Sequence, residues 1–167
     1  MPSIELHAAH RDDHDTLDSL MQFYLHDFSE WLPLKLGENG FYPIGPTLDY
    51  WRHPATRAFL IRVDNELAGF ISVDGNTHLK GAEHNLGYLF VCRRWRGRGV
   101  AQFVVSDLLS RIPGQWQIFH IDANRPAQRF WAGAIPALSS GAFTCEQRVI
   151  DGYPCTVYGL QSPAPMA

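Results

Sequence analysis

Two glycines one residue apart, Gly97 and Gly99, separate a strand-like run from a helix-like run. The apolar strand-like run covers Leu86 to Val91, and the helix-like run covers Val100 to Leu109. Glycine lets the backbone turn sharply and lets a ligand approach it closely. The start of the following helix offers unpaired N–H groups and partial positive charge, which favour a bound phosphate. The pattern therefore predicts a loop that holds an anion.

The spacing of the glycines excludes two common phosphate-binding loops. A P-loop carries Lys and then Ser or Thr after its second glycine, where this chain has Val100-Ala101. A dinucleotide-binding G-x-G-x-x-G needs a third glycine where this chain has Gln102. The sequence Arg94-x-x-Gly97-x-Gly99 instead resembles the pyrophosphate signature R/Q-x-x-G-x-G/A of the GNAT superfamily of acetyl-CoA-dependent N-acetyltransferases.

A second motif follows in the order that this family has. Asn124-x-x-Ala127-x-x-Phe130-Trp131, after a strand-like run, resembles the family segment N-x-x-A-x-x-[FL]-Y. Asn124 is also a preferred residue for capping the start of a helix. The Phe-Trp ending and the aromatic N-terminal half resemble a group of predicted bacterial acetyltransferases of unknown substrate.

Hydrophobic periodicity and turn residues predict the remaining elements. The predicted strands are Ile4–Ala9, Phe59–Val63, Leu67–Val73, Glu83–Val91, Trp116–Ile121, Phe143–Ile150 and Tyr153–Leu160. The predicted helices carry the apolar stripe from Leu17 to Leu32 and the segments Leu48–Trp51, Val100–Ile112 and Arg125–Trp131. This order, β-α-(short α)-β-β-β-α-β-α-β-β, is that of the GNAT fold, a mixed α/β sheet flanked by helices. We expect one domain over residues 1–160 and a frayed tail over residues 161–167.

Composition limits the classes of protein that the chain can belong to. It has 167 residues, 46% hydrophobic and 19% charged, with a formal net charge of −3, so the sequence predicts one globular domain with no overall attraction to nucleic acid. No apolar run reaches the roughly 18–20 residues of a membrane span. The first residues lack the basic and apolar regions of a signal peptide. We therefore expect a cytoplasmic protein.

The three cysteines predict neither a disulfide framework nor a zinc site, because they form no C-x-x-C pair. Asp151-Gly152 is a strong signal for a two-residue hairpin turn. That turn would place Cys155 opposite Arg148 and Cys145 opposite Tyr158, so the two thiols would not face each other. We expect free cysteines.

The resemblance implies where acetyl-CoA binds. The backbone of Phe90 and Val91 would hold the pantetheine arm, and the N–H of Leu89 would polarise the thioester carbonyl. The pyrophosphate would be held by the loop residues Arg94, Arg96, Gly97, Arg98, Gly99, Val100 and Ala101. The far side of the pantetheine would be lined by Asn124, Ala127, Phe130 and Trp131. No metal is expected.

Two positions depart from the family pattern. Many members carry a glutamate as general base where this chain has Asn85, which cannot take a proton. Glu83 lies two residues earlier, on the same face of the predicted strand. Glu83 could act through a water, or water alone could accept the proton. The family tyrosine that often protonates the leaving thiolate is Trp131 here, so water would supply that proton.

The resemblance also places the acceptor against the first helix, the loop after it and the last hairpin. Phe23, Asp27 and Glu30 share a flank of that helix, and Tyr42, Tyr50 and Trp51 come from the loop. Carboxylates among aromatic rings suit a cationic amine. The alternative is that these carboxylates only form a solvated face.

Other readings compete with the acetyltransferase. Four arginines among positions 93–98 are typical of nucleic-acid binding, but the phosphates of CoA account for the same charge. His7, His10 and His14 do not share a face, which argues against a metal site. Asn85 and Trp131 together leave open a non-catalytic acyl-CoA-binding module. A homodimer through the last hairpin or its edge is consistent with the fold.

Overall fold

The computed structural model describes residues 1–162. The described chain forms two compact units, the first from residues 1–73 and 88–100 and the second from residues 74–87 and 101–162. The expectation of one domain over residues 1–160 stays a prediction. The predicted tail began at Gln161, but Gln161 is the last residue of the last strand. Ser162 is buried. Its hydroxyl accepts from the N–H of Gly114, and its own N–H donates to the carbonyl of Gly114. The rest of that tail lies outside the described residues.

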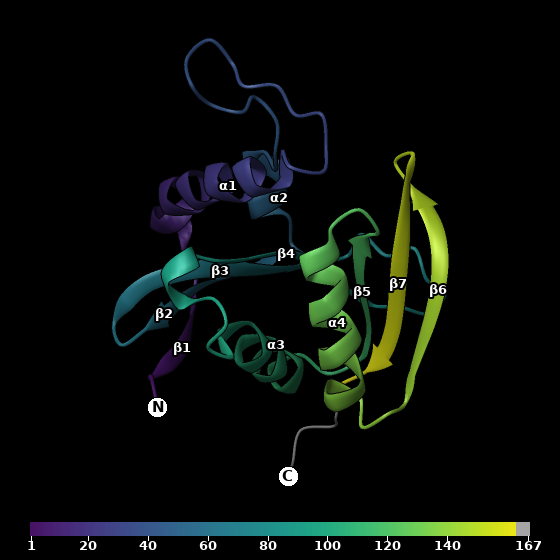
Figure 1. Cartoon of the computed structure of the whole chain (residues 1–167). Helices are drawn as coiled ribbons and strands as arrows, with labels where there is room; N and C mark the ends of the chain where they lie inside the picture. Colours follow the sequence, from purple (N-terminus) through teal and green to yellow (C-terminus); the bar gives the residue numbers. More distant parts are fainter. Residues whose placement is uncertain (163–167) are drawn as a thin grey trace. The chain divides into compact units, whose positions relative to one another are not determined.

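The element order agrees with the sequence pattern (Figure 1). The elements are β1 (Ile4–Ala8), α1 (His14–Phe28), α2 (Leu48–Arg52), β2 (Arg57–Val63), β3 (Glu66–Asp74), β4 (His84–Val91), α3 (Val100–Arg111), β5 (Gln115–Ile121), α4 (Arg125–Leu138), β6 (Phe143–Ile150) and β7 (Tyr153–Gln161). The strands form one mixed sheet in the order β1-β2-β3-β4-β5-β7-β6, with β4 and β5 parallel. The predicted mixed α/β fold is confirmed.

The first unit is built on the antiparallel strands β1, β2 and β3. Asp64 and Asn65 have φ values of 50° and 66°, which form the tight turn between β2 and β3. The apolar stripe of α1 faces these strands, and α1 and α2 lie on the same side of them (Figure 1). The resulting core contains Leu17, Leu20, Met21, Leu25, Trp51, Leu60, Phe70 and Phe90.

Helix α1 is shorter than its apolar stripe suggested. The stripe continues to Leu32, but the helix ends at Phe28. The hydroxyl of Ser29 donates to the carbonyl of His26, and the N–H of Trp31 donates to the carbonyl of Phe28. Trp31 therefore lies in a turn after the helix, and its ring contacts that of Phe28 with 5.5 Å between centroids.

The second unit contains the hairpin β6–β7. Asp151 and Gly152 have φ values of 52° and 84°, as a two-residue turn of this type requires. The register places Arg148 opposite Cys155 and Cys145 opposite Tyr158, as predicted. All three cysteines are free.

Helix α4, beside β5 in the second unit, is longer than predicted (Figure 1). The side chain of Asn124 caps it by accepting from the N–H of Ala127 at 3.1 Å, which confirms the predicted cap. The predicted helix ran from Arg125 to Trp131. The helix continues to Leu138 because residues after Trp131, such as Ile135, are buried. In residues 1–162 no helix is long and apolar enough to cross a membrane.

Candidate functional site

The glycine loop has the backbone shape that the sequence predicted. Gly97 and Gly99 have φ values of 72° and 78°, which residues other than glycine rarely adopt. A Cβ atom at either position would meet no other atom within 4 Å. Packing therefore does not require glycine here. The backbone conformation requires it, and the open space above the loop can receive a ligand.

The strand before the loop lies unusually close to its neighbour. A Cβ atom at Gly69 of β3 would lie 1.9 Å from the carbonyl oxygen of Phe90 on β4. Further along, the N–H of Tyr88 donates to the hydroxyl of Ser72 at 3.0 Å. Leu89 is half-buried, and the side chain of Phe90 is buried. This contact fixes the backbone of the residues that were predicted to hold pantetheine.

Two arginines beside the glycines bind a single carboxylate of α1. Asp27 accepts from Arg96 at 2.5 Å and from Arg93 at 3.3 Å. Arg96 also donates its Nε to the carbonyl of Val91 at 2.7 Å and lies over the ring of Phe90, 5.6 Å from its centroid. Asp27 was predicted for the acceptor site and Arg96 for the cofactor loop, and here they form one cluster.

The other two arginines lie over a tryptophan that the sequence analysis did not single out. The guanidinium carbons of Arg94 and Arg98 are 5.1 and 5.4 Å from the ring centroid of Trp95. Arg94 also pairs with Glu66 at 3.3 Å. Trp95 is buried, and its indole N–H has no hydrogen-bond partner among the described residues. The sequence signal that could have identified Trp95 is its place as an aromatic residue between two arginines.

Aromatic rings from α1, α2 and β4 meet in the first unit. Tyr88 lies edge-on to Tyr24 and Tyr50, with centroid distances of 5.3 and 5.5 Å, and 6.5 Å from Trp51. The hydroxyls of Tyr50 and Ser72 are 2.9 Å apart. Burial, reinforced by Tyr88, raises the pKa of Tyr24 far above its ordinary value. Tyr24 therefore stays a neutral phenol.

The residues predicted for the acceptor do not form one group. Tyr50 and Trp51 are adjacent in the aromatic cluster, but Trp51 is buried and donates to Asp18 at 3.2 Å. Tyr42 is held by a pair of hydrogen bonds between its backbone and the side chain of Gln22.

Phe23, also predicted for the acceptor, is 61% exposed, and its ring stacks on Phe90 with 6.3 Å between centroids. Glu30 is exposed just beyond the end of α1. The assignment of these residues to an acceptor stays a prediction.

The second unit contains Asn85, the residue at the expected position of the base. Its amide nitrogen donates to Asp74 at 2.9 Å, and its oxygen accepts from Gln117 at 2.8 Å. Gln117 in turn accepts from the backbone N–H groups of His78 and Leu79. The side chains of Asp74, Asn85 and Gln117 are all buried. The network holds residues 76–79 against β4 and β5.

Glu83 and the residues near Asn124 also belong to the second unit. The exposed carboxylate of Glu83 accepts from the N–H of Gln115 at 2.9 Å. Asn124 caps α4, Trp131 is buried, and Ala127 and Phe130 are half-buried.

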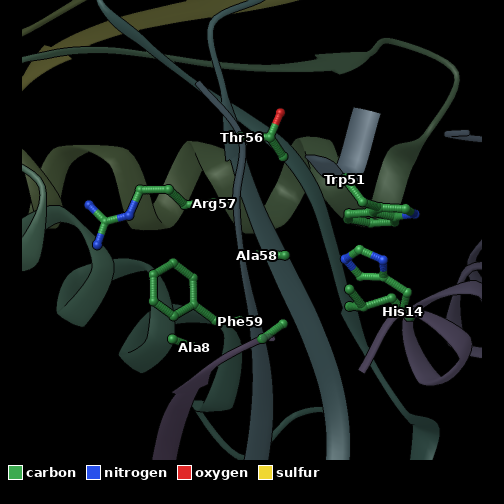
Figure 2. A pocket seen from close by; sticks show the side chains of 9 residues that line it. Ala8, His14, Trp51, Thr56, Arg57, Ala58 and Phe59 are labelled. Atoms are coloured by element: carbon green, nitrogen blue, oxygen red, sulfur yellow. The ribbon is translucent and has the colours of Figure 1, made fainter. Parts of the chain in front are cut away.

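A small surface pocket of about 210 Å³ lies in the first unit, away from the glycine loop residues. Figure 2 shows its lining, with Trp51 and His14 on one side and Arg57 and Phe59 on the other. Of the predicted site residues, only Trp51 contributes to it. Within residues 1–162, no group of three or more His, Cys, Asp or Glu side chains is placed to hold a metal ion.

Comparison with known families identifies the chain. The family model described as acetyltransferase (GNAT) family matches residues 17–133. The chain belongs to the GNAT acetyltransferase family. The predicted family is confirmed, and with it acetyl transfer as the class of activity and the prediction of an N-acetyltransferase.

Solved structures share the fold of this GNAT acetyltransferase. An acetyltransferase from Thermus thermophilus is 17% identical with a TM-score of 0.62, and the match covers 95% of this chain and 97% of that chain. The spermidine N-acetyltransferase of Vibrio cholerae, solved in complex with CoA and spermine, is 12% identical with a TM-score of 0.64 and 95% of each chain covered. No curated protein sequence compared with the chain matches it significantly.

Proposed function

We propose that this GNAT member is an acetyl-CoA-dependent N-acetyltransferase that transfers the acetyl group directly to an amine in a ternary complex. The observation that supports this most is the glycine loop. Gly97 and Gly99 hold left-handed conformations below open space, in a loop that carries four arginines. This combination suits the diphosphate of CoA.

The residues of the first unit would bind the co-substrate. Backbone N–H groups of the loop would donate to the diphosphate, and the backbone of Phe90 and Val91 would bind pantetheine. The N–H of Leu89 would donate to the thioester oxygen, where negative charge develops as the amine attacks. Ala101, Asn124, Ala127, Phe130 and Trp131 stay predicted contacts.

The chemistry needs a neutral amine and a leaving thiolate. The amine lone pair attacks the thioester carbon, the C–N bond forms and the C–S bond breaks. The thiolate of CoA takes a proton from water, since the buried indole of Trp131 is no useful acid. The proton of the amine passes to Glu83 through a water, or to water alone. No covalent enzyme intermediate is part of this proposal.

For the acceptor we propose a cationic amine. Asp27 and Glu30 supply negative charge, and Phe23 exposes an aromatic ring on the same helix as Asp27. Both favour a cation. Tyr42, Tyr50 and the buried Trp51 stay predicted contacts. Polyamines are the first class to test, because a protein of the same fold was solved with spermine.

The proposal is tested by measuring free CoA released from acetyl-CoA in the presence of spermidine, spermine, lysine and a peptide with a free N-terminus. Acetyl transfer predicts thiol release that depends on the amine. Binding of acetyl-CoA in a calorimeter with no release for any amine would favour the non-catalytic acyl-CoA-binding module. A cytoplasmic location and a homodimer also stay predictions, the latter to be checked by the mass of the protein in solution.

A further inference from the structure

The four arginines of the glycine loop are held in two different ways. Arg93 and Arg96 share the carboxylate of Asp27, whereas Arg94 and Arg98 lie over the indole of Trp95. Arg94 also pairs with Glu66, so Arg98 alone of the four has no carboxylate partner among the described residues. A carboxylate neutralises charge, but an aromatic face leaves a guanidinium charged. Two of the four arginines therefore share one counter-ion within the protein before any phosphate is present.

The geometry assigns a role to Asp27. We infer that Asp27 is an internal competitor of the CoA phosphates, and that Arg93 and Arg96 pass from its carboxylate to those phosphates when CoA binds. Asp27 is thus a positioning residue that sets the affinity for CoA. This inference rests on the proposed binding of acetyl-CoA to the glycine loop.

The exchange requires little rearrangement. The side chain of Arg93 is 78% exposed and that of Arg96 43% exposed, so both can turn without opening the core. Ion pairs between such exposed groups contribute little stability. A phosphate offers more negative charge and more acceptor oxygens than a carboxylate, and it binds guanidinium groups through paired hydrogen bonds. The phosphates should therefore displace Asp27.

One arginine keeps its anchor during this exchange. The Nε of Arg96 donates to the carbonyl of Val91, and its guanidinium lies over Phe90. Asp27 accepts from one terminal nitrogen of Arg96, Nη2. Arg96 can thus change its partner while it stays fixed to the strand that precedes the loop.

The exchange also links the two substrates. Once the arginines leave, Asp27 carries an uncompensated charge on the helix flank proposed for the acceptor. A cationic amine there would stabilise the released state. Binding linkage then requires that amine and CoA each raise the affinity for the other.

The test is a calorimetric titration of CoA into the wild-type protein and three variants. Asp27→Asn keeps the shape of the side chain and removes its charge. Asp15→Asn is the matched control, because it makes the same change at another exposed carboxylate of α1, one that has no ion pair among the described residues. Arg93→Gln removes one of the arginines that are proposed to move.

We expect Asp27→Asn to bind CoA about three- to tenfold more tightly. Asp15→Asn should stay within about twofold of wild type, and Arg93→Gln should bind at least about threefold more weakly. Equal or weaker binding by Asp27→Asn, or an equal gain from Asp15→Asn, overturns the inference. If Asp27→Asn is misfolded, as shown by a circular dichroism spectrum unlike that of wild type, Arg93→Gln is the deciding variant. An Arg93→Gln protein with wild-type affinity for CoA then overturns the inference. If the wild-type protein binds no CoA, the proposed function itself fails.

Discussion

Asn85 donates its side-chain amide to the carboxylate of Asp74 across 2.9 Å in the buried interior of the second unit. The position at which family members often carry a catalytic glutamate is therefore occupied by a residue whose amide nitrogen and oxygen are both bound. The orientation of Asn85 is fixed because its oxygen accepts from Gln117, which the backbone of residues 78 and 79 holds in turn. The geometry points to a structural role for Asn85.

The first prediction concerns the stability of this network. Asp74→Ala leaves the amide of Asn85 and the N–H of Asn76 without their acceptor. A buried donor without a partner costs about 1–3 kcal/mol, so we expect the free energy of unfolding to fall by about 2 kcal/mol or more. Urea denaturation measures it. Asp107→Ala is the control, because it breaks only a surface pair with Arg111 in α3 and should change stability by less than about 1 kcal/mol.

The second prediction concerns Glu83 as the base. Glu83→Gln keeps an oxygen that can accept from Gln115, so the local structure should persist while the proton acceptor is lost. Loss of a general base lowers the rate by about 10²–10⁴-fold, and we expect kcat to fall at least tenfold with CoA affinity unchanged. Steady-state rates across pH 6–9 measure this. A variant with wild-type kcat over that range would assign the proton to water.

The third prediction concerns glutamate at position 85, which would restore the family residue. In Asn85→Glu the new carboxylate would lie beside the buried carboxylate of Asp74, and two such charges repel each other. We therefore expect this variant to melt at a lower temperature and to leave Glu83→Gln unrescued. Adding Asp74→Asn removes the repulsion and should restore both stability and part of the rate. Rescue by Asn85→Glu alone would contradict this account.

Much of the fold could be predicted because local signals agreed with tertiary structure. Asp151-Gly152 fixed the register of β6 and β7, and Asn124 fixed the start of α4. Errors arose where packing overrode a local signal. Helix α4 was predicted to end at Trp131, but it continues through Pro136 to Leu138 with Ile135 buried.

The candidate site was less predictable than the fold. The two glycines could be predicted, because their role depends on their own backbone conformation and the spacing of glycines is visible in the sequence. The pairing of Asp27 with Arg93 and Arg96 joins residues more than 60 positions apart, and no local pattern indicates it. The burial of Trp95 between two arginines depends on packing in the same way.

The fourth prediction separates ligand exclusion from backbone strain at the loop. Valine at Gly97 or Gly99 must adopt a positive φ, which costs roughly 1–2 kcal/mol of stability. Gly141→Val is the control, because Gly141 has a φ of 81° and equally open space in a turn of the second unit. All three variants should lose similar stability. Only those at Gly97 and Gly99 should lose CoA affinity, by tenfold or more in calorimetry, because a side chain there occupies the proposed diphosphate position. Equal CoA affinity in all three would place the diphosphate elsewhere.

The last prediction concerns the close approach of β3 to β4. In Gly69→Ala the new methyl group would lie 1.9 Å from the carbonyl oxygen of Phe90, so the two strands must separate. Such overpacking costs about 1–3 kcal/mol, and it displaces the backbone proposed to bind pantetheine. We expect a lower melting temperature together with weaker binding of acetyl-CoA. Gly133→Ala in α4 is the matched control, because its new methyl group meets nothing within 4 Å and alanine stabilises a helix by roughly 0.5–1 kcal/mol over glycine. Thermal melts with and without acetyl-CoA measure both effects. A Gly69→Ala protein with wild-type stability and affinity would show that the spacing of β3 and β4 does not position the pantetheine.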